Sequence, residues 1–559
     1  MKGGWTGLGR ACATSALLVG ACASAGCRAT WELRAAAAEA PTPRGVVMFF
    51  VDGMDRDTTR GLLDAGRLPN IERLFVRGGV CVEHAVAALP AVTYANTSSL
   101  LTGRWPSRHG ILGNVWFDRE SLSFRNYSAL TKFRKVNEHL AAATIFELLS
   151  DRLTVNVLCH TDRGATRSFH GLVTAGMPWL LRDFRGVDAR VGASAAQVGA
   201  FARERGEWPA FWLNYFPGVD EVGHHDGPAS KAYRDAIVNA DAQIGRVDTA
   251  VRASPLAGQA YYVLVSDHGH VQSPRDRRMD LTEWLRREHR RKVCYETGRD
   301  LDLTQRALEF NECDAVVLVN ANRTAAIHLR GRQSWFEAPT RETRERIACG
   351  VPGAEAGLVD VPAVGLVCYS IGAGVVRVHA GSRVCVVERD AAVDGEARYR
   401  LYDRATSAHA DVRDALGYRV DGQLAAFIDA GWHTGREWLA ATAGTRYPDF
   451  VPQIVELFDS PRAGDVVVFA ADDWSFDREQ PGGHGAALAS DMRIWLSFSG
   501  PDLPAGTSLP TARIVDVVPT MLELLGESEC LRTAGPFDGV SLAGPLRAAG
   551  LRAVADGNP

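Results

Sequence analysis

Six acidic and histidine residues of this 559-residue sequence stand where they could do chemistry, because each follows an apolar run or lies in a glycine-rich turn. They are Asp52, Asp220, His224, Asp267, His268 and His484. Taken singly, an Asp before Gly is usually a turn residue, and a lone His is usually a surface or core residue. Together, Asp and His are ligands of zinc and similar divalent ions. Six of them suffice for two ions, an arrangement used for in-line displacement at phosphorus.

A metal pair of this kind also needs a nucleophile, and the sequence offers a hydroxyl at Thr93. Thr93 comes shortly after Pro90, where the pattern predicts that a helix begins. The free N–H groups at a helix N-terminus can bind an oxyanion. The alternative is that Thr93 only caps the helix, with Thr97 and Ser98 as ordinary helix residues. The local sequence by itself favours this capping role.

The elements that must position these residues are alternating strands and helices. Apolar runs that end in turn residues predict buried strands, as at Gly45–Val51, and helical periodicity appears between such runs, as at Ala236–Val251. This alternation predicts a mostly parallel sheet covered by helices on both faces. Functional residues of such sheets lie just past the carboxyl ends of the strands. The other predicted strands are Thr154–Cys159, Ala210–Phe216, Tyr261–Val265, Val466–Ala470 and Ile494–Phe498.

Residues 276–440 interrupt this rhythm with charged runs, several cysteines and short strand-like segments. We interpret them as a cap inserted between two parts of a catalytic core, residues 45–275 and 441–545, with 546–559 as a tail. A basic run at 286–292 could bind an anionic ligand. A solvated helix face is the more common explanation of such a run.

The first residues have the pattern of a bacterial lipoprotein leader. Positive charges precede an apolar stretch at 11–21, which is too short to span a bilayer, and small residues lead to Cys22. Residues 1–21 are therefore predicted to be a signal peptide with Cys22 as the lipidated residue, followed by an Ala- and Pro-rich linker at 22–44. An ordinary secretory peptide cut a few residues later is the alternative. Either form predicts an extracytoplasmic protein, periplasmic or anchored to the outer membrane.

The composition excludes several classes of protein. Hydrophobic residues make up 46% and charged residues 23%, which is typical of a globular chain. The net charge of −4 lacks the basic excess of a nucleic-acid scaffold. No apolar run reaches the roughly 20 residues of a membrane-spanning helix, so a lipid anchor is the one membrane contact that we expect. The 11 cysteines include no CxxC pair, which argues against a cysteine zinc site, and their pairing cannot be deduced.

Taken in order, these residues resemble the alkaline phosphatase superfamily, and specifically its type I phosphodiesterase/nucleotide pyrophosphatase branch. The resemblance covers about residues 45–275 and 445–545. It implies an α/β fold with a mostly parallel sheet sandwiched by helices, and an enzyme that hydrolyses small-molecule phosphate esters. The matching segments are Val51-Asp52-Gly53, Leu68 to Ile71, Thr93 to Gly103, Pro106 to Asn114, Asp220 to His224, Ser266 to Gly269, His484-Gly485, Asp516 to Gly526 and Asp538 to Leu542.

The resemblance also implies roles for single residues. It implies Asp220, His224 and His484 as ligands of one metal ion, and Asp52, Asp267 and His268 as ligands of the other, with zinc as the family's usual choice. Thr93 would be the nucleophile that forms a phospho-threonine intermediate, and Asn114 would contact a phosphoryl oxygen. His225 and His270 occupy no motif position, so we do not expect them to be ligands.

The sequence bears less directly on the choice between a diester and a monoester. Related monoesterases carry Lys-x-Arg after a core strand, and here the matching place holds Thr161 and Arg163. Arg163 would contact phosphate, or it would be a surface residue. The absent Lys favours diesters, whereas the segment 114–118 resembles the monoesterase relatives. A phosphodiesterase is therefore the leading hypothesis and a phosphomonoesterase the alternative. A phosphotransferase or a sulfatase-like relative is less expected, and a formylglycine-type sulfatase would need Cys or Ser where Thr93 stands. An inactive lipid-anchored binding protein is also less expected, because no site residue is missing.

Overall fold

The computed structural model describes residues 44–128, 132–170, 176–296, 301–390, 396–402, 414–477 and 479–555. The predicted signal peptide, Cys22 and the predicted linker up to residue 43 lie outside these described residues. Within the described ranges, no helix combines the length and the apolar character that crossing a membrane requires.

The first sheet contains the strands that lead to the candidate site. Its order is β20-β2-β21-β8-β1-β7-β5-β6, and β22 also pairs with β2. The central strand β1 is parallel to both β7 and β8, while β21 is antiparallel to β8 and β2. The predicted mostly parallel sheet is confirmed. Its strands are β1 (Gly45–Val51), β2 (Val80–Val86), β5 (Thr154–Val157), β6 (Arg167–Phe169), β7 (Phe211–Phe216), β8 (Ala260–Val265), β20 (Arg493–Ile494), β21 (Leu496–Ser499) and β22 (Thr507–Arg513).

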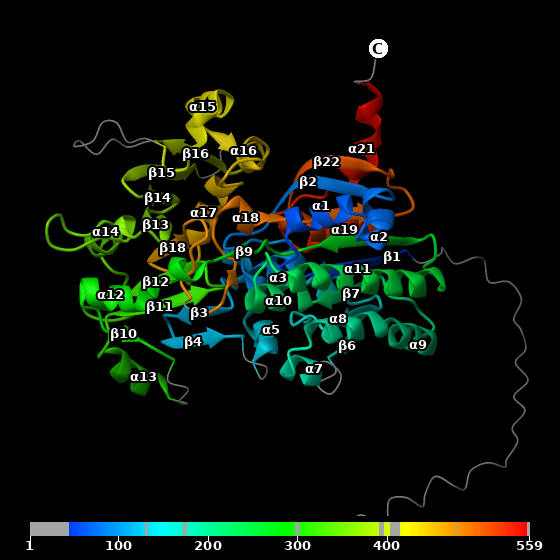
Figure 1. The fold of residues 1–559 in the computed structure, drawn as a ribbon, viewed down its shortest axis with the longest axis horizontal. Coiled ribbons are helices and arrows are strands. Elements are labelled where there is room, and N and C mark those ends of the chain that lie inside the picture. The colour runs from blue at the N-terminus through cyan, green and yellow to red at the C-terminus, as the bar shows by residue number, and fades with distance from the viewer. Residues whose placement is uncertain are drawn as a thin grey trace, which may run out of the picture. The chain divides into compact units, whose positions relative to one another are not determined.

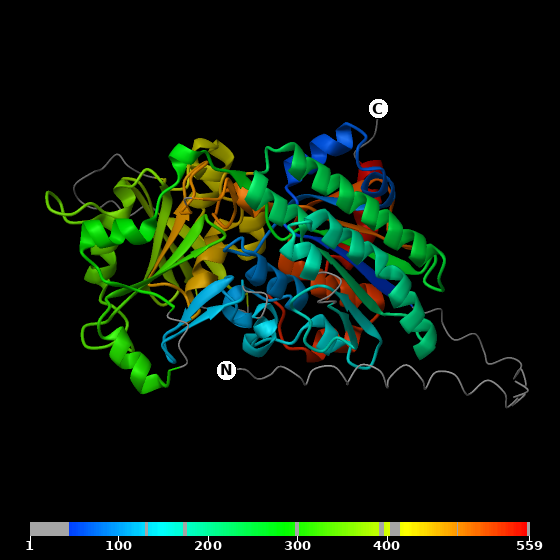
Figure 2. The same cartoon turned by 60° about the horizontal axis from the view of Figure 1, so that its bottom comes forward.

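Helices cover both faces of this sheet, and Figures 1 and 2 show α8, α9 and α11 side by side along one face. The helices of this part are α1 (Arg56–Asp64), α2 (Pro69–Ile71), α3 (Thr93–Thr102), α4 (Pro106–His109), α5 (Val136–His139), α6 (Ile145–Leu148), α7 (Gly176–Leu180), α8 (Phe184–Ala193), α9 (Ala195–Arg205), α10 (Gly218–Asp226), α11 (Lys231–Arg252), α19 (Val517–Leu525), α20 (Ser528–Thr533) and α21 (Ala543–Ala555). The expected helix at 236–251 is therefore part of the longer α11.

The side chains of β1 show why its sequence is a continuous apolar run. Val47 and Phe49 pack in one hydrophobic cluster with Ile237 of α11. Met48 and Phe50 point to the opposite face, into a cluster that includes side chains of α3 and α19. Because successive residues of a strand alternate between faces, a strand buried on both sides has no polar positions. The core thus encloses β1 and fixes the edge at which this strand ends.

A second sheet has the order β10-β11-β12-β18-β13-β14-β15-β16-β17 and is antiparallel apart from the β10–β11 pair. Its strands are β10 (Val293–Cys294), β11 (Ala315–Asn320), β12 (Thr324–Leu329), β13 (Val364–Gly372), β14 (Val375–Ala380), β15 (Arg383–Asp390), β16 (Arg398–Tyr402), β17 (His433–Thr434) and β18 (Val466–Ala470). The accompanying helices are α12 (Leu281–His289), α13 (Leu303–Phe310), α14 (Arg341–Cys349), α15 (Gly422–Asp429), α16 (Gly435–Thr442) and α17 (Phe450–Phe458). The short α18 (Ala489–Met492) leads directly into β20 of the first sheet.

The position of β18 differs from the expectation that it belongs to the first sheet. β18 lies between β12 and β13, antiparallel to both. The prediction was wrong because an apolar run of β-branched residues indicates a buried strand but not its partners. Two short antiparallel pairs complete the strands of the described residues: the hairpin of β3 (Val115–Asp118) with β4 (Ser123–Asn126), and the pair of β9 (Val271–Gln272) with the distant β19 (Gly482–Gly483).

Candidate functional site

Five of the six candidate ligands lie at one edge of the first sheet. Asp52 directly follows β1, Asp220 and His224 lie on α10 just after β7, and Asp267 and His268 follow β8. β7, β1 and β8 are neighbours and run in parallel. Their carboxyl ends therefore meet, which brings together residues far apart in the sequence.

Gly53 allows the turn after β1 to pass close to α10. Its φ is +60°, a conformation that side chains disfavour, and a Cβ there would lie 2.8 Å from Oδ1 of Asp220. The N–H of Gly53 donates to Oδ1 of Asp267 at 3.1 Å. Asp52 and Gly53 thus form a turn, as an Asp-Gly pair usually does. This turn also brings together the carboxylates that follow three neighbouring strands.

His484 reaches the site by a different route. It follows β19, which pairs with β9 beyond the end of β8. Its backbone N–H donates to the carbonyl of Ala321 at 2.8 Å, and its Nδ1 lies 2.8 Å from the carbonyl oxygen of Ala91. These contacts direct its Nε2 toward Asp220, 3.5 Å from Oδ1.

The donor atoms of the site form three overlapping groups. They are Asp220/His224/His270, Asp220/His268/His484 and Asp52/Asp267/His268, and the ligand atoms of each lie within 4.8 Å of one another. The carboxylate oxygens and imidazole nitrogens in contact are 3.3–3.5 Å apart. Two atoms that each lie 2.0–2.1 Å from a tetrahedral zinc ion are about 3.3 Å apart. The spacing of the donors therefore fits small divalent ions.

The electrostatics of the site also fit cations. Asp52, Asp220 and Asp267 are buried, and each has one oxygen without a hydrogen-bond partner among the described residues. Burial, together with the charge of Asp52, raises the pKa of Asp267 well above its usual range. Burial by itself would lower the pKa of His268, but Asp267 and Asp52 raise it to about 10. A divalent cation would compensate this concentration of buried carboxylates.

The three histidines that the resemblance implies as ligands share one hydrogen-bonding pattern. In each ring, Nδ1 faces a carbonyl oxygen: Gly482 for His224 at 3.1 Å, Gly269 for His268 at 2.9 Å, and Ala91 for His484 at 2.8 Å. A carbonyl only accepts, so Nδ1 carries a proton in each ring and Nε2 is the nitrogen that faces the carboxylates. In metal-binding histidines generally, such a hydrogen bond from the second ring nitrogen fixes the tautomer and the orientation of the ring.

Thr93 is the first residue of α3, as the pattern predicts. The N-cap residue is Val92, and no side chain caps this helix, so Thr93 does not have the capping role that the local sequence favours. Its Oγ1 instead lies 3.2 Å from Nε2 of His268. The hydroxyl thus stands beside the donor groups and at the N-terminus of a helix, where backbone N–H groups can face an anion.

Asn114 lies next to the start of α3. Its Oδ1 accepts the N–H of Tyr94 at 3.1 Å, which ties the amide to the residue after Thr93. Because the oxygen is used in this way, the NH₂ group is the part of Asn114 that can donate to an oxygen near Thr93.

The guanidinium of Arg163 is engaged by neighbouring protein groups. Its guanidinium pairs with Glu147 at 2.8 Å and donates to the carbonyls of Leu140 and Ala142 at 2.7 and 2.6 Å. These partners favour the alternative that Arg163 is a structural residue, here one that joins β5's loop to α6.

The hairpin between β11 and β12 supports the site from the second sheet, and sequence reasoning missed it. The amide of Asn320 pairs with both backbone groups of Val115, next to Asn114, at 2.9 and 3.0 Å. Ala321 accepts from His484, as described above. The Asn-Ala-Asn-Arg turn after an apolar strand was a sequence signal for a tight hairpin, but it does not reveal what the turn touches.

His270 is the second residue that sequence reasoning set aside. The structure places its Nδ1 3.3 Å from Oδ1 of Asp220, inside one of the donor groups. Burial is the main cause that lowers the pKa of His270 to about 4, and the neighbouring His224 lowers it further. The ring is therefore neutral at neutral pH. The run Asp267-His268-Gly269-His270 was the sequence signal that could have identified His270 as a candidate ligand.

Comparison with known families agrees with this arrangement. The family model described as type I phosphodiesterase/nucleotide pyrophosphatase matches residues 46–354, which is more than half of the chain. The chain belongs to this family. Its alkaline-phosphatase-like fold, expected from the resemblance, is therefore confirmed. The family match ends before His484, so the structure, and not the match, places that residue in the site.

Similarity to individual members of the type I phosphodiesterase/nucleotide pyrophosphatase family is distant. The chain is 22% identical over 240 residues to ectonucleotide pyrophosphatase/phosphodiesterase family member 3 of Mus musculus, which covers 43% of this chain and 26% of that protein. It is 25% identical over 218 residues to family member 5 of Homo sapiens, covering 38% of this chain and 43% of that protein. An uncharacterized pyrophosphatase/phosphodiesterase of Schizosaccharomyces pombe is 24% identical over 228 residues, covering 40% and 44%. The chain thus spans between a quarter and a half of these relatives' length.

Proposed function

We propose that the protein is a two-metal-dependent hydrolase of small-molecule phosphate esters, acting as a phosphodiesterase or nucleotide pyrophosphatase. The observation that carries the proposal is the hydroxyl of Thr93, at the N-terminus of α3 and 3.2 Å from His268 among the donor groups. Family membership and the names of the relatives support the phosphoester chemistry.

The chain's own groups suit a displacement in two steps. When bound, the ions would lower the pKa of the Thr93 hydroxyl and take up charge on the reacting oxygens. Oγ1 of Thr93 attacks phosphorus as the bond from phosphorus to the leaving oxygen breaks on the opposite side, and the proton of Thr93 ends on the leaving group. The phosphoryl group, with the second substituent of a diester, stays on Thr93 as the phospho-threonine intermediate. The first-turn N–H groups of α3 and the NH₂ of Asn114 hold the phosphoryl oxygens. Water then displaces Oγ1 of Thr93, which regains a proton from that water, and a diester substrate leaves as the phosphate monoester.

We propose zinc for both ions because of the donor types. Imidazole nitrogens and single carboxylate oxygens make up all three donor groups. Zinc prefers such mixed nitrogen and oxygen ligands, whereas magnesium and calcium prefer sites built from oxygen.

The surroundings of Arg163 support a diester over a monoester. A monoester carries more negative charge than a diester, so its hydrolysis benefits from a further cation at the phosphoryl oxygens. The guanidinium of Arg163 is already paired with Glu147. A phosphomonoesterase is the alternative, since the segment 114–118 resembles monoesterase relatives.

Matched kinetics test the proposed function. The purified protein, loaded with zinc, is assayed with an aryl phosphate diester and the aryl monoester that shares its leaving group. We expect kcat/KM to be at least about tenfold higher for the diester, a difference of about 1.4 kcal/mol in transition-state stabilisation. A preference for the monoester would overturn the diester assignment. The absence of turnover with either ester would overturn the proposal as a whole.

We also propose that the chain is exported and anchored by a lipid on Cys22. The support is the leader pattern in residues 1–21; these residues lie outside those that the structure describes. Cys22→Ala should move the protein from the membrane fraction to the soluble fraction of the cell envelope, since a single lipid-modified residue would be lost. Cys27→Ala is the matched control and should stay with the membranes. Membrane retention of Cys22→Ala would contradict the anchor.

A further inference from the structure

His270 is a buried histidine whose Nε2 has no hydrogen-bond partner among the described residues, while its Nδ1 faces the carboxylate of Asp220. The residue is 5% exposed. Burying a polar group without a partner is unfavourable, and such groups in folded proteins call for an explanation. Binding of a cation by one ring nitrogen would satisfy this imidazole in its buried position.

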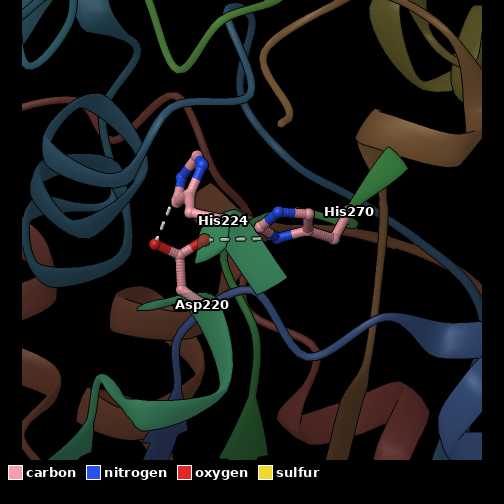
Figure 3. A group of neighbouring side chains, drawn as sticks. All are labelled: Asp220, His224 and His270. Atoms are coloured by element: carbon pink, nitrogen blue, oxygen red, sulfur yellow. Dashed lines mark ion pairs between the residues drawn. The ribbon is translucent and has the colours of Figure 1, made fainter. Parts of the chain in front are cut away.

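The ring is directed at a carboxylate that already faces another histidine. Oδ1 of Asp220 lies 3.3 Å from Nδ1 of His270, and Oδ2 lies 3.5 Å from Nε2 of His224. Figure 3 shows the two rings reaching the Asp220 carboxylate from different sides. Their centroids are 4.8 Å apart and their planes stand at 72°. One carboxylate and two imidazoles thus converge, with their ligand atoms within 4.8 Å of one another.

Two glycines make the space that this ring occupies. A Cβ on Gly223 of α10 would lie 2.7–3.0 Å from three ring atoms of His270. A Cβ on Gly482 of β19 would lie 2.8 Å from its Nε2. Distances under 3.0 Å would force the ring or the backbone to shift. α10, which carries His224, and β19, which leads to His484, therefore both leave room for an imidazole at position 270.

We infer that His270 is a further ligand of the ion held by Asp220 and His224, one imidazole more than the resemblance to the family implies. The inference rests on the metal-dependent function proposed above. The Nε2 of His484 is 3.5 Å from the same carboxylate, so three imidazoles lie within 3.5 Å of Asp220. This donor set is rich in nitrogen and should bind zinc in strong preference to magnesium or manganese.

The test compares zinc binding and cobalt spectra of the full protein and of His270→Gln. Metal-free protein is titrated with zinc in competition with a chromophoric chelator, and the cobalt(II) form is examined by visible absorption. The wild-type protein should bind two zinc ions. His270→Gln should bind one of them at least about 100-fold more weakly, because loss of a ligand's hydrogen-bond partner already weakens metal binding 10–100-fold. The cobalt absorption bands of that site should also change.

Two variants provide matched controls. His225 is the residue after His224 on α10, but its ring stacks on Phe184, with the centroids 5.7 Å apart and the planes at 8°. His225→Gln should therefore keep the zinc affinity and the cobalt spectrum of the wild type. His484→Gln should weaken zinc binding, because the family resemblance already implies that His484 is a metal ligand.

Each outcome bears on the inference in a defined way. Wild-type affinity and spectrum in His270→Gln would overturn it. Weaker binding with an unchanged cobalt spectrum would also overturn it, since His270 would then only orient Asp220. A wild-type protein that binds no zinc would overturn the proposed function itself, which is a separate result.

A measurement on the unaltered protein guards against a variant that does not fold. In a crystal structure of the zinc-loaded wild-type protein, a nitrogen of His270 should lie 2.0–2.1 Å from an anomalous zinc peak. A separation above about 3 Å would exclude ligation, since it exceeds any zinc–nitrogen bond.

Discussion

Thr93→Ala should lower the turnover of an aryl phosphate diester by on the order of 10⁴-fold or more, because it removes the nucleophile on which both steps depend. The zinc content should stay at the wild-type value, since the Asp and His side chains of the three donor groups are unchanged. Steady-state kinetics and elemental analysis of the same preparation measure the two quantities. An active Thr93→Ala protein would refute the assignment of the nucleophile.

A second variant and a chemical trap sharpen this result. Thr93→Ser keeps a hydroxyl at the start of α3 and should retain measurable turnover. Rapid acid quenching of the wild-type reaction with the diester, followed by peptide mass spectrometry, should find on Thr93 the phosphoryl group with the substrate's remaining ester substituent. If the wild type is active but no such peptide forms, the two-step course is wrong even where Thr93 matters.

Asp491→Asn should lower the free energy of unfolding by about 3–5 kcal/mol, the usual cost of breaking a buried ion pair. Arg323 and Asp491 have fully buried side chains, and their contact is 2.9 Å long. The amide of Asn cannot balance the charge of Arg323, whose side chain is fully buried. Oδ1 of Asp491 also accepts the N–H of Ala486, close to His484. Denaturant unfolding of the metal-free protein measures the loss without a contribution from metal binding.

Asp472→Asn is the matched control for this prediction. It breaks a pair of the same chemistry, Arg446–Asp472 at 2.6 Å, but the two side chains are 52% and 55% exposed. Water screens exposed charges, so this change should cost less than about 1 kcal/mol. Equal losses in the two variants would contradict the view that burial of Arg323 sets the size of the effect.

Much of the first sheet was predictable because its determinants are local. The apolar run at β1 and the Asp-Gly that ends it specify a strand and a turn by composition alone. The rule that parallel strands end at a common edge then joins Asp52, Asp220 and Asp267 without knowledge of the tertiary structure. The start of α3 at Thr93 was also predictable, although the local preference for a capping role was wrong.

Other features depend on contacts between distant segments. β18 has the same kind of sequence as the core strands, yet it pairs with β12 and β13 of the second sheet. Arg163 stands where a phosphate contact was expected, yet Glu147 and nearby carbonyls engage it. Local sequence specifies neither case, because pairing partners and side-chain neighbours are selected by packing over the whole chain.

By itself, the sequence predicted the candidate ligands and the edge of the sheet where they gather, since motif spacing and strand periodicity are local properties. The resemblance to the family added Thr93 as the candidate nucleophile. Only the tertiary structure decided that His270 joins Asp220 and that the hairpin of β11 and β12 supports His484. It did so because Gly223 and Gly482, far apart in the sequence, come together and leave room for one more imidazole.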